Sequence, residues 1–407
     1  MRKNYLAKLV KYIKNVFDIE KGLNNLTDGR KNPTFKTKIV VLPVLFAFIL
    51  RTRSFNELNN CIVENEFKNL LPRGCKLPKI DAIRDTLKVI DVSKIRVILK
   101  DTVRKARENK VFTNGTIDGY VVAAIDGTQT YNSDKKSCDK CLKASKKGKK
   151  EQRNFHSSVV LSTIGDRARL VLDFEPYRAG VDKAEKDEGE LTTAKRLIER
   201  TTTDHKGLID VIVYDAIGCN SEWLNACDEV EVDAIVRVKC NNINSVKEIK
   251  KQVNKSEPVL VWKDDASYES VTVYEGFFRM QKGEKELRFV KFRMKSHDKK
   301  YTQIMIVTTC IDMKLDTIFR IIRGRQDIEN SIFNYLKKEC GLEHCYVHGG
   351  DAIEAVLCLK FIAANLVRLF YYRRIRKSVV TQVELVRLLK KGLYLIKRSP
   401  AYVFSTA

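Results

Sequence analysis

The spacing of apolar residues changes along the chain, and the first part has the period of α-helices. In residues 5–25 apolar side chains recur every three or four positions, with lysines on the opposite face. Further helices are predicted at residues 35–51, 79–90 and 93–109, and the first of these is the most apolar. Ser93 is expected to cap the last one. We therefore interpret residues 1–112 as a helical N-terminal region.

From residue 120 onward the pattern is that of strands that alternate with helices. Strands are predicted at residues 120–125, 157–164, 167–174, 208–214, 233–238 and 303–309, and helices at 183–201, from 221, and from 315 onward. Gly165 and Asp166 separate two of the strands and predict a hairpin. This order predicts an α/β domain with a mixed sheet flanked by helices.

The overall charge adds a first indication of function. The 407 residues include 76 Lys and Arg against 51 Asp and Glu, which gives a net charge of +25. Such an excess favours binding to polyanions, so DNA is the first candidate partner and an anionic membrane surface the second. A chain that is basic without a specific polyanionic partner is the third interpretation.

No segment of the sequence predicts export or insertion into a membrane. The first residues lack the apolar core of a signal peptide. The longest apolar run, residues 39–50, contains Pro43 and is shorter than the roughly 20 residues that a spanning helix needs. The 11 cysteines are irregularly spaced, which favours a reducing compartment over a disulfide framework. We expect a soluble cytoplasmic protein that associates with the nucleoid.

Three acidic residues stand where an α/β domain commonly places its site. Asp126 and Asp215 each follow an apolar strand, and Glu329 lies in a predicted helix. Carboxylates are the ligands that Mg²⁺ and Mn²⁺ prefer, and two such ions supply the charge neutralisation that phosphoryl transfer on DNA needs. Taken alone, an Asp after a strand is more often a turn residue or a helix cap.

The residues around these three carboxylates resemble the signature segments of IS4-like DDE transposases. The segments are AIDGT at 124–128, VYDAIG at 213–218 and IEN at 328–330. KAEKDEGEL at 183–191, LEHCYVH at 342–348, Arg323 and Arg325 before the Glu, and the run 333–337 after it extend the match. The resemblance covers about residues 120–370, in order.

This resemblance implies an RNase H-like catalytic domain, here residues 113–376, with a β-rich insertion at about 240–300. It implies that Asp126, Asp215 and Glu329 bind two Mg²⁺ or Mn²⁺ ions for DNA cleavage and joining. The implied partners are the terminal inverted repeats of a transposon and target DNA, bound by a homodimer that bridges two ends. Residues 1–112 would help to recognise DNA, although a bundle that only supports the next domain fits equally well, and residues 377–407 would be a basic helical tail.

Two positions depart from the family pattern. A Tyr usually stands seven residues before the Glu, where this chain has Ile322, and a Lys usually stands seven residues after it, where Leu336 is followed by Lys337. Lys337, Arg323 and Arg325 are candidate DNA contacts. Arg325 shares a helix face with the Glu and is placed to bind a phosphate or to orient the carboxylate. A solvated basic face is the other interpretation of the two arginines.

A basic loop follows the first carboxylate segment. Residues 135–153 contain nine Lys or Arg and two acidic residues. The candidate DNA-binding residues in this loop are Lys146, Lys147, Lys149 and Lys150. A basic loop beside a metal site is well placed to hold a DNA backbone, and solvated disorder is the alternative.

The same loop contains the pair Cys138 and Cys141, and His156 follows it. These three residues are candidate zinc ligands, whereas a closed structural zinc site needs four. A second group is interpreted as core or surface residues, because two adjacent ligands are awkward at a helix end; it consists of Cys340, His344, Cys345 and His348. A zinc ion is therefore a minor alternative for this loop.

Two further residues are assigned to structural roles. Glu190 begins a predicted helix and is expected to complement the positive end of the helix dipole rather than to approach the metal site. Trp262 is expected to lie in the core rather than to stack on an extruded base.

Other functions stay open at this point. A nuclease of the same fold would cleave DNA without joining it. A non-catalytic DNA-binding descendant would bind DNA without a divalent metal. A membrane-surface protein is supported by the charge alone.

Overall fold

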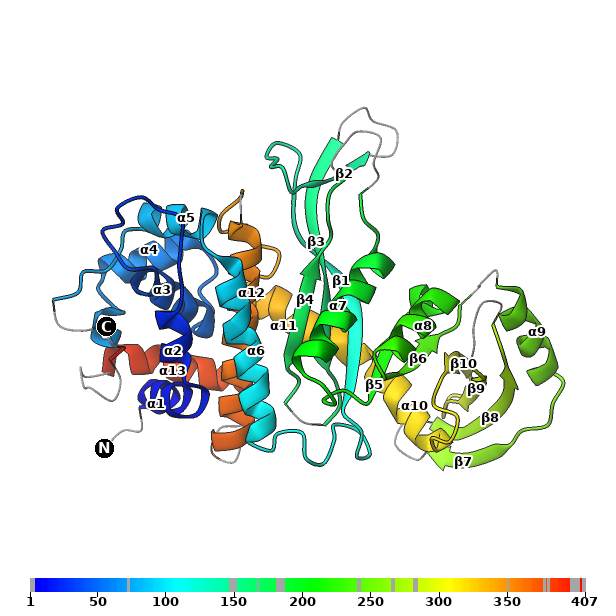
Figure 1. The fold of residues 1–407 in the computed structure, drawn as a ribbon. Coiled ribbons are helices and arrows are strands. Elements are labelled where there is room, and N and C mark those ends of the chain that lie inside the picture. The colour runs from blue at the N-terminus through cyan, green and yellow to red at the C-terminus, as the bar shows by residue number, and fades with distance from the viewer. Residues whose placement is uncertain are drawn as a thin grey trace.

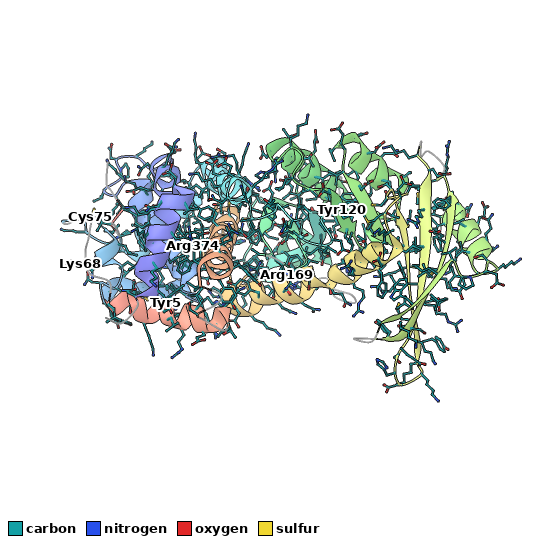
Figure 2. All side chains as sticks on the ribbon, turned by 90° about the horizontal axis from the view of Figure 1, so that it is seen from below. Tyr5, Lys68, Cys75, Tyr120, Arg169 and Arg374 are labelled. Carbon is teal, nitrogen blue, oxygen red and sulfur yellow. The ribbon has the colours of Figure 1, made fainter. Side chains whose placement is uncertain are left out.

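The structure is a computed structural model, and it describes most of the chain. The described residues are 4–71, 74–145, 152–166, 168–180, 187–239, 243–264, 268–280, 285–349, 351–375, 378, 381–395 and 403–404. Seen from below, a helical layer, a central sheet and an insertion follow one another along the molecule, with Tyr5 and Arg374 in the helical layer and Tyr120 at the central sheet (Figure 2).

The central sheet has the strand order β4-β3-β1-β5-β6. Its strands are β1 Val122–Ser133, β3 Gln152–Thr163, β4 Val171–Pro176, β5 Val211–Tyr214 and β6 Asp233–Arg237. Strand β3 is antiparallel to both β1 and β4, whereas β5 is parallel to β1 and β6 is parallel to β5. Three antiparallel strands followed by two parallel ones, with the first strand in the centre, are the RNase H-like arrangement. The predicted mixed α/β fold is confirmed.

The sheet continues on both sides of this core. The short strand β2, Leu142–Ser145, pairs with β3 at one edge. At the other edge β6 pairs with the antiparallel series β10 Tyr301–Thr308, β9 Leu287–Lys295, β8 Tyr268–Phe278 and β7 Leu260–Asp264. Helix α9, Asn244–Val253, packs on β8. The insertion is therefore β-rich, as expected, and it extends the central sheet instead of forming a separate one (Figure 1).

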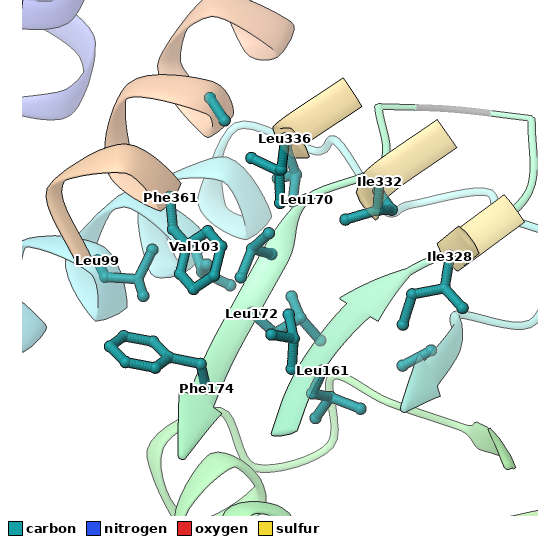
Figure 3. Close-up of a cluster of buried hydrophobic side chains, with 14 of the residues drawn as sticks. Leu99, Val103, Leu161, Leu170, Leu172, Phe174, Ile328, Ile332, Leu336 and Phe361 are labelled. Atoms are coloured by element: carbon teal, nitrogen blue, oxygen red, sulfur yellow. The ribbon is translucent and has the colours of Figure 1, made fainter. Parts of the chain in front are cut away.

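Helices cover both faces of the central sheet. Helices α7 Glu190–Asp204 and α8 Ser221–Glu229, with the short turn η2 Ala216–Gly218 between β5 and α8, lie in front of it in Figure 1. Behind it runs an almost continuous helix made of α10 Leu315–Gly324, the π-helical segment η3 Ile328–Phe333 and α11 Asn334–Cys340. In this second run Ile328, Ile332 and Leu336 are buried and point toward the sheet (Figure 3).

The helical layer combines the beginning and the end of the chain. Its N-terminal helices are α1 Tyr5–Phe17, α2 Ile19–Asn24, α3 Thr37–Ile49, α4 Phe55–Val63, η1 Lys68–Leu70, α5 Ile80–Lys88 and α6 Val92–Glu108. Its C-terminal helices are α12 Ala352–Phe370, η4 Tyr371–Ile375 and α13 Gln382–Leu395. Helices α3 and α6 pack on α12, and α1 packs on α13. Because α12 also contacts β4, this apolar helix joins the layer to the sheet.

Three local expectations need correction. The helix predicted at residues 5–25 breaks at Asp18, which has a φ of 51° and separates α1 from α2. The cap of α6 is Asp91, whose side chain accepts from the Ser93 N–H at 3.1 Å, because a carboxylate there satisfies the free N–H groups of the first turn. Strand β1 does not end before Asp126 but continues to Ser133, because β3 pairs with it along that whole length.

The helix predicted at residues 183–201 is α7, which begins only at Glu190; residues 183–186 lie outside the described residues. Several other features agree with the prediction. The hairpin around Gly165 is confirmed, and Gly165 adopts a φ of 106°. A Cβ at this position would lie 2.4 Å from the Thr116 carbonyl oxygen, so the turn requires glycine. Asn220 caps α8 by accepting from the Trp223 N–H, as its position predicts. Among the described helices, none combines the length and the apolar character needed to cross a bilayer.

Candidate active site

The first two carboxylates are neighbours on adjacent parallel strands. Ala124 of β1 pairs with Val213 of β5, so the same register continued by two residues places Asp126 beside Asp215. Asp126 is held in the middle of a strand, opposite Val160 of β3. Asp215 follows the last residue of β5, and its side chain accepts from the Ile217 N–H at 2.8 Å. The cap expected as the alternative role for Asp215 is therefore present beside its position next to Asp126.

Glu329 reaches the same strand from the helix behind the sheet. It lies in η3, which contacts β1, and its neighbour Ile328 is completely buried against the sheet. The Glu329 side chain itself is 54% exposed. A π-helical segment inside an α-helical run is rare and is commonly found at functional sites.

Contacts with the β3–β4 hairpin fix η3 in position. The guanidinium of Arg169 pairs with Asp327 at 3.0 Å and donates to the Ser331 hydroxyl at 2.6 Å. Arg368 of α12 donates to the carbonyl oxygens of Arg169 and Ser331. Arg169 therefore holds η3 through residues on both sides of Glu329, namely Asp327 and Ser331.

Asp126 lies in an acidic environment. Burial raises the pKa of Asp126 to about 7; the guanidinium of Arg325 opposes this, and the carboxylates of Glu190, Glu329 and Asp215 add to it. A group of acidic side chains with little opposing positive charge is an environment that favours a bound cation. The donors are carboxylate oxygens, which suit hard divalent ions such as Mg²⁺ and Mn²⁺.

These carboxylates do not form a closed ligand cage. Over the part of the chain that the structure describes, only one group of at least three His, Cys, Asp or Glu has ligand atoms all within 4.8 Å of one another, and it lies elsewhere. The ligand atoms of Asp126, Asp215 and Glu329 are therefore more widely spaced than those of that group.

Glu190 is a residue of this region that the sequence did not assign to it. It is the first residue of α7, as predicted, yet its two carboxylate oxygens accept from the hydroxyls of Tyr214 at 2.9 Å and Tyr177 at 3.2 Å. A Cβ on Gly127 would lie 2.7 Å from the Glu190 Oε2 atom. Since side chains alternate along β1, Asp126 and Gly127 face opposite sides of the sheet, so Glu190 contacts the strand on the face opposite the Asp126 side chain.

The expectation for Glu190 is corrected accordingly. Glu190 stands at the start of a helix, and it also contacts β1 at Gly127, on the face of the sheet opposite the Asp126 side chain. Its carboxylate contributes to the raised pKa of Asp126. Burial and the Glu190 carboxylate raise the pKa of both Tyr177 and Tyr214, so these hydroxyls stay protonated and keep donating. The only signal in the sequence was its place in the family-like segment KAEKDEGEL.

The close approach at Gly127 leads to a first prediction. We expect Gly127→Ala to push Glu190 away from its two tyrosines and to displace β1, and so to lower DNA cleavage about 10-fold, as is usual when a group that supports metal ligands is disturbed. The matched control is Gly189→Ala, which adds the same methyl group next to Glu190 but meets nothing within 4 Å. Equal activity of the two variants would refute the role of this contact; cleavage rates and melting temperatures measure it.

The two candidate arginines before Glu329 point to different places. Arg325 is only 7% exposed, and its Nη1 atom lies 3.1 Å from Glu329 Oε1, which fits orientation of the carboxylate and not a solvated basic face. Arg323 is exposed and stacks on the rings of Tyr268 and Phe319, at the insertion. Lys337 is exposed and pairs with Glu343 at 2.9 Å.

The basic loop is described only in part. Lys146, Lys147, Lys149 and Lys150 lie outside the described residues. Of the described part, Lys135 and Lys136 are exposed, whereas Lys140 pairs with Asp351 just before α12 at 2.5 Å. Trp262 is half-buried and packs edge-on against Phe319, which agrees with its expected role in the core.

The three candidate zinc ligands do come together, and a fourth joins them. Cys138, Cys141 and His156 meet His348, and one ligand atom of each lies within 4.8 Å of all the others. His348 belongs to the second group of Cys and His, which was interpreted as core or surface residues; the structure places His348 beside the three candidate zinc ligands. Sequence reasoning missed this fourth candidate ligand because 207 positions separate Cys141 from His348 along the chain.

The chain is similar to known transposases in sequence and in fold. A family model described as "Transposase DDE domain" matches residues 117–366, which include all three candidate carboxylates. Among solved structures, the chain is similar to a piggyBac transposase in a synaptic complex with hairpin DNA, at 10% identity and a TM-score of 0.46, over 98% of this chain and 83% of that one. No curated protein matches the chain.

Proposed function

Since this chain belongs to the transposase DDE domain family and is a DNA transposase, we propose that it cleaves DNA at transposon ends and joins them to target DNA, with Asp126, Asp215 and Glu329 as the metal-binding residues. What supports the assignment is that the register of β1 and β5 places Asp126 beside Asp215, and that η3, which carries Glu329, contacts β1. Membership of the narrower IS4-like group is part of the proposal and rests on the sequence segments alone.

The proposed metals are two Mg²⁺ or Mn²⁺ ions. The ligands offered are oxygen atoms, and the acidic group around Asp126 has one buried guanidinium, that of Arg325, against four carboxylates. Two divalent ions bound there would activate the attacking hydroxyl and stabilise the leaving oxygen of an in-line displacement at phosphorus.

The protein itself contributes positioning in this proposal. Asp126 lies on the central strand, whose backbone is bonded to β3 on one side and to β5 on the other. Arg325 orients the Glu329 carboxylate, and Arg169 holds the helix segment on which it stands. Preorganised groups of this kind keep reacting atoms aligned without further movement of the chain.

The proposed substrates are the terminal inverted repeats of a transposon and a target duplex, bound by a homodimer. The net charge of +25 supports an extensive phosphate contact, and association with the nucleoid would follow from it. Arg323 and Lys337 are exposed on the helical run that carries Glu329 and are proposed DNA contacts. The helical N-terminal region is proposed to take part in recognising the ends.

A strand-transfer assay tests this function directly. The full chain is incubated with a pre-cleaved end that bears a free 3′ hydroxyl, with a target duplex and with Mg²⁺ or Mn²⁺. We expect joined products that depend on the metal and on the carboxylates. Cleavage of uncut ends without joining would identify a nuclease, and binding that is unchanged without metal and gives no product would identify a non-catalytic DNA-binding protein.

A further inference from the structure

A second group of metal-ligating side chains lies away from the carboxylates. Cys138 and Cys141 come from the turn between β1 and β2, His156 from β3, and His348 from the segment that joins α11 to α12. The Sγ atoms of the two cysteines are 3.6 Å apart, and the His156 Nε2 atom is 3.4 Å from Cys138 Sγ and 3.2 Å from Cys141 Sγ. The His348 Nε2 atom is 3.5 Å from Cys141 Sγ.

These separations are those of a tetrahedral zinc site. With Zn–S bonds of about 2.3 Å and Zn–N bonds of about 2.0–2.1 Å, a tetrahedron places two sulfurs about 3.8 Å apart and a sulfur and a nitrogen about 3.5 Å apart. Each of the four measured distances lies within about 0.3 Å of these values. A disulfide requires sulfurs about 2.05 Å apart, so the cysteine pair is not arranged as one.

The surroundings of the four side chains are those of a closed structural site. Cys141 is 2% exposed, and the other three ligands are half-buried. The Cys138 N–H donates to Cys141 Sγ at 3.3 Å, a bond that stabilises a thiolate. The ring of Tyr131 lies 4.6 Å from that of His348 and covers one side. Four protein ligands leave no position open for a substrate, as in structural zinc sites.

We propose that Cys138, Cys141, His156 and His348 bind one structural Zn²⁺ ion. Two thiolates and two imidazoles in tetrahedral positions favour zinc over the hard ions proposed for the carboxylates. The ion fastens the β1–β3 part of the sheet to the segment before α12. Because the ion pair between Lys140 and Asp351 joins the same two segments, the zinc reinforces an existing contact.

This link has a consequence for the arrangement of the carboxylates. Strand β1 carries Asp126, and the helical run that carries Glu329 ends at Cys340, eight residues before His348. The zinc therefore closes a loop between the two segments that must meet at the active site. Its role is to stabilise the fold, and its ligands do not touch the reacting atoms.

The test is the metal content of the purified full chain. We expect one zinc per chain by plasma mass spectrometry, and, after exchange with Co²⁺, the visible absorption of tetrahedral cobalt bound to thiolates. Cys138→Ser and His348→Gln are expected to lose the metal and to lower the melting temperature, because binding to a folded site adds to stability. Circular dichroism checks that these variants fold.

Matched controls separate this site from its neighbours. Cys345→Ser and His344→Gln change a half-buried cysteine and a histidine near His348, and both are expected to keep one zinc. Asp126→Asn is also expected to keep it, so failure of the zinc site and failure of the proposed catalytic site are distinguishable. A wild-type chain that holds no zinc after incubation with the ion, or a His348→Gln variant that holds it fully, would overturn the proposal. Two reactive thiols in a zinc-free wild type would instead indicate a redox dithiol.

Discussion

The substitutions Asp126→Asn, Asp215→Asn and Glu329→Gln are each expected to abolish DNA cleavage and to leave binding of DNA ends nearly intact. Each replaces a proposed carboxylate ligand by a neutral amide of the same shape. Metal ions stabilise the transition state of phosphoryl transfer by several kcal/mol, and about 1.4 kcal/mol corresponds to a factor of ten in rate. We therefore expect losses of roughly 10³-fold or more, measured as cleavage of labelled ends in Mg²⁺ and in Mn²⁺.

The control for this series is Glu222→Gln on α8. Glu222 is 69% exposed and pairs with Lys195, so the same chemical change there is expected to leave the cleavage rate unchanged. Binding is followed in parallel by gel shift, because loss of binding would explain inactivity in another way. Wild-type cleavage by any of the three variants would remove that residue from the proposed triad.

Replacing Arg325 by Gln is expected to lower cleavage by about 100-fold, the upper end of the range for groups that orient metal ligands. Arg325 is buried and lies 3.1 Å from Glu329, and its guanidinium is the positive charge that acts on Asp126. Without it the Glu329 side chain loses its fixed orientation. Arg325→Lys is expected to recover only part of the activity, because an ammonium keeps the charge but lacks the planar fork of the guanidinium.

Arg320→Gln is the control for Arg325, since Arg320 lies on α10, the helix that ends just before Arg325, but is 57% exposed and pairs with Asp118. Melting temperatures of the variants separate an effect on the site from an effect on the fold. If Arg325→Gln cleaves DNA at the wild-type rate in a folded state, Arg325 does not orient Glu329 during the reaction.

The sequence predicted those helices and strands that are determined by local patterns of apolar and polar residues. The alternation of apolar and polar residues located β3 and β4 and the hairpin at Gly165, and the apolar run before Asp215 located β5. The same local patterns could not give the length of β1, because Asp126 and the polar residues after it are held in a strand by pairing with β3. Pairing between strands that are far apart in the sequence produces no periodic pattern of apolar residues that could predict it.

The residues that sequence reasoning missed all depend on such distant pairing. Glu190 contacts β1 because α7 lies across the sheet, and His348 joins Cys138 and Cys141 because the segment before α12 folds back to the β1–β2 turn. In both cases the residue type was noticed and its partners were not. Only the topology shows which Glu and which His meet the other members of a site.

The packing of α12 affects how DNA recognition by the N-terminal region can be tested. Side chains of α12 from Ala355 to Phe370 are buried, and α3 and α6 cover them. In Figure 3, Leu99 of α6 faces Phe361 of α12. Removal of residues 1–112 would expose this apolar helix, so end recognition is better tested with substitutions of exposed basic side chains in the full chain.

The π-helical segment η3 offers an account of the shifted lysine. A π-turn holds one residue more than an α-turn, so eight steps along a helix that includes one cover the rotation of seven ordinary steps. Lys337 stands eight residues after Glu329, and η3 lies between them. The extra residue of the π-turn therefore compensates for the extra residue between Glu329 and Lys337, and Lys337 has the angular position that a lysine seven residues after Glu329 would have on a regular helix. Leu336, which stands at the seventh position, is completely buried and faces the core. A single inserted codon in this helix would have been accommodated as a local widening of the coil, without turning the rest of the helix away from its partners.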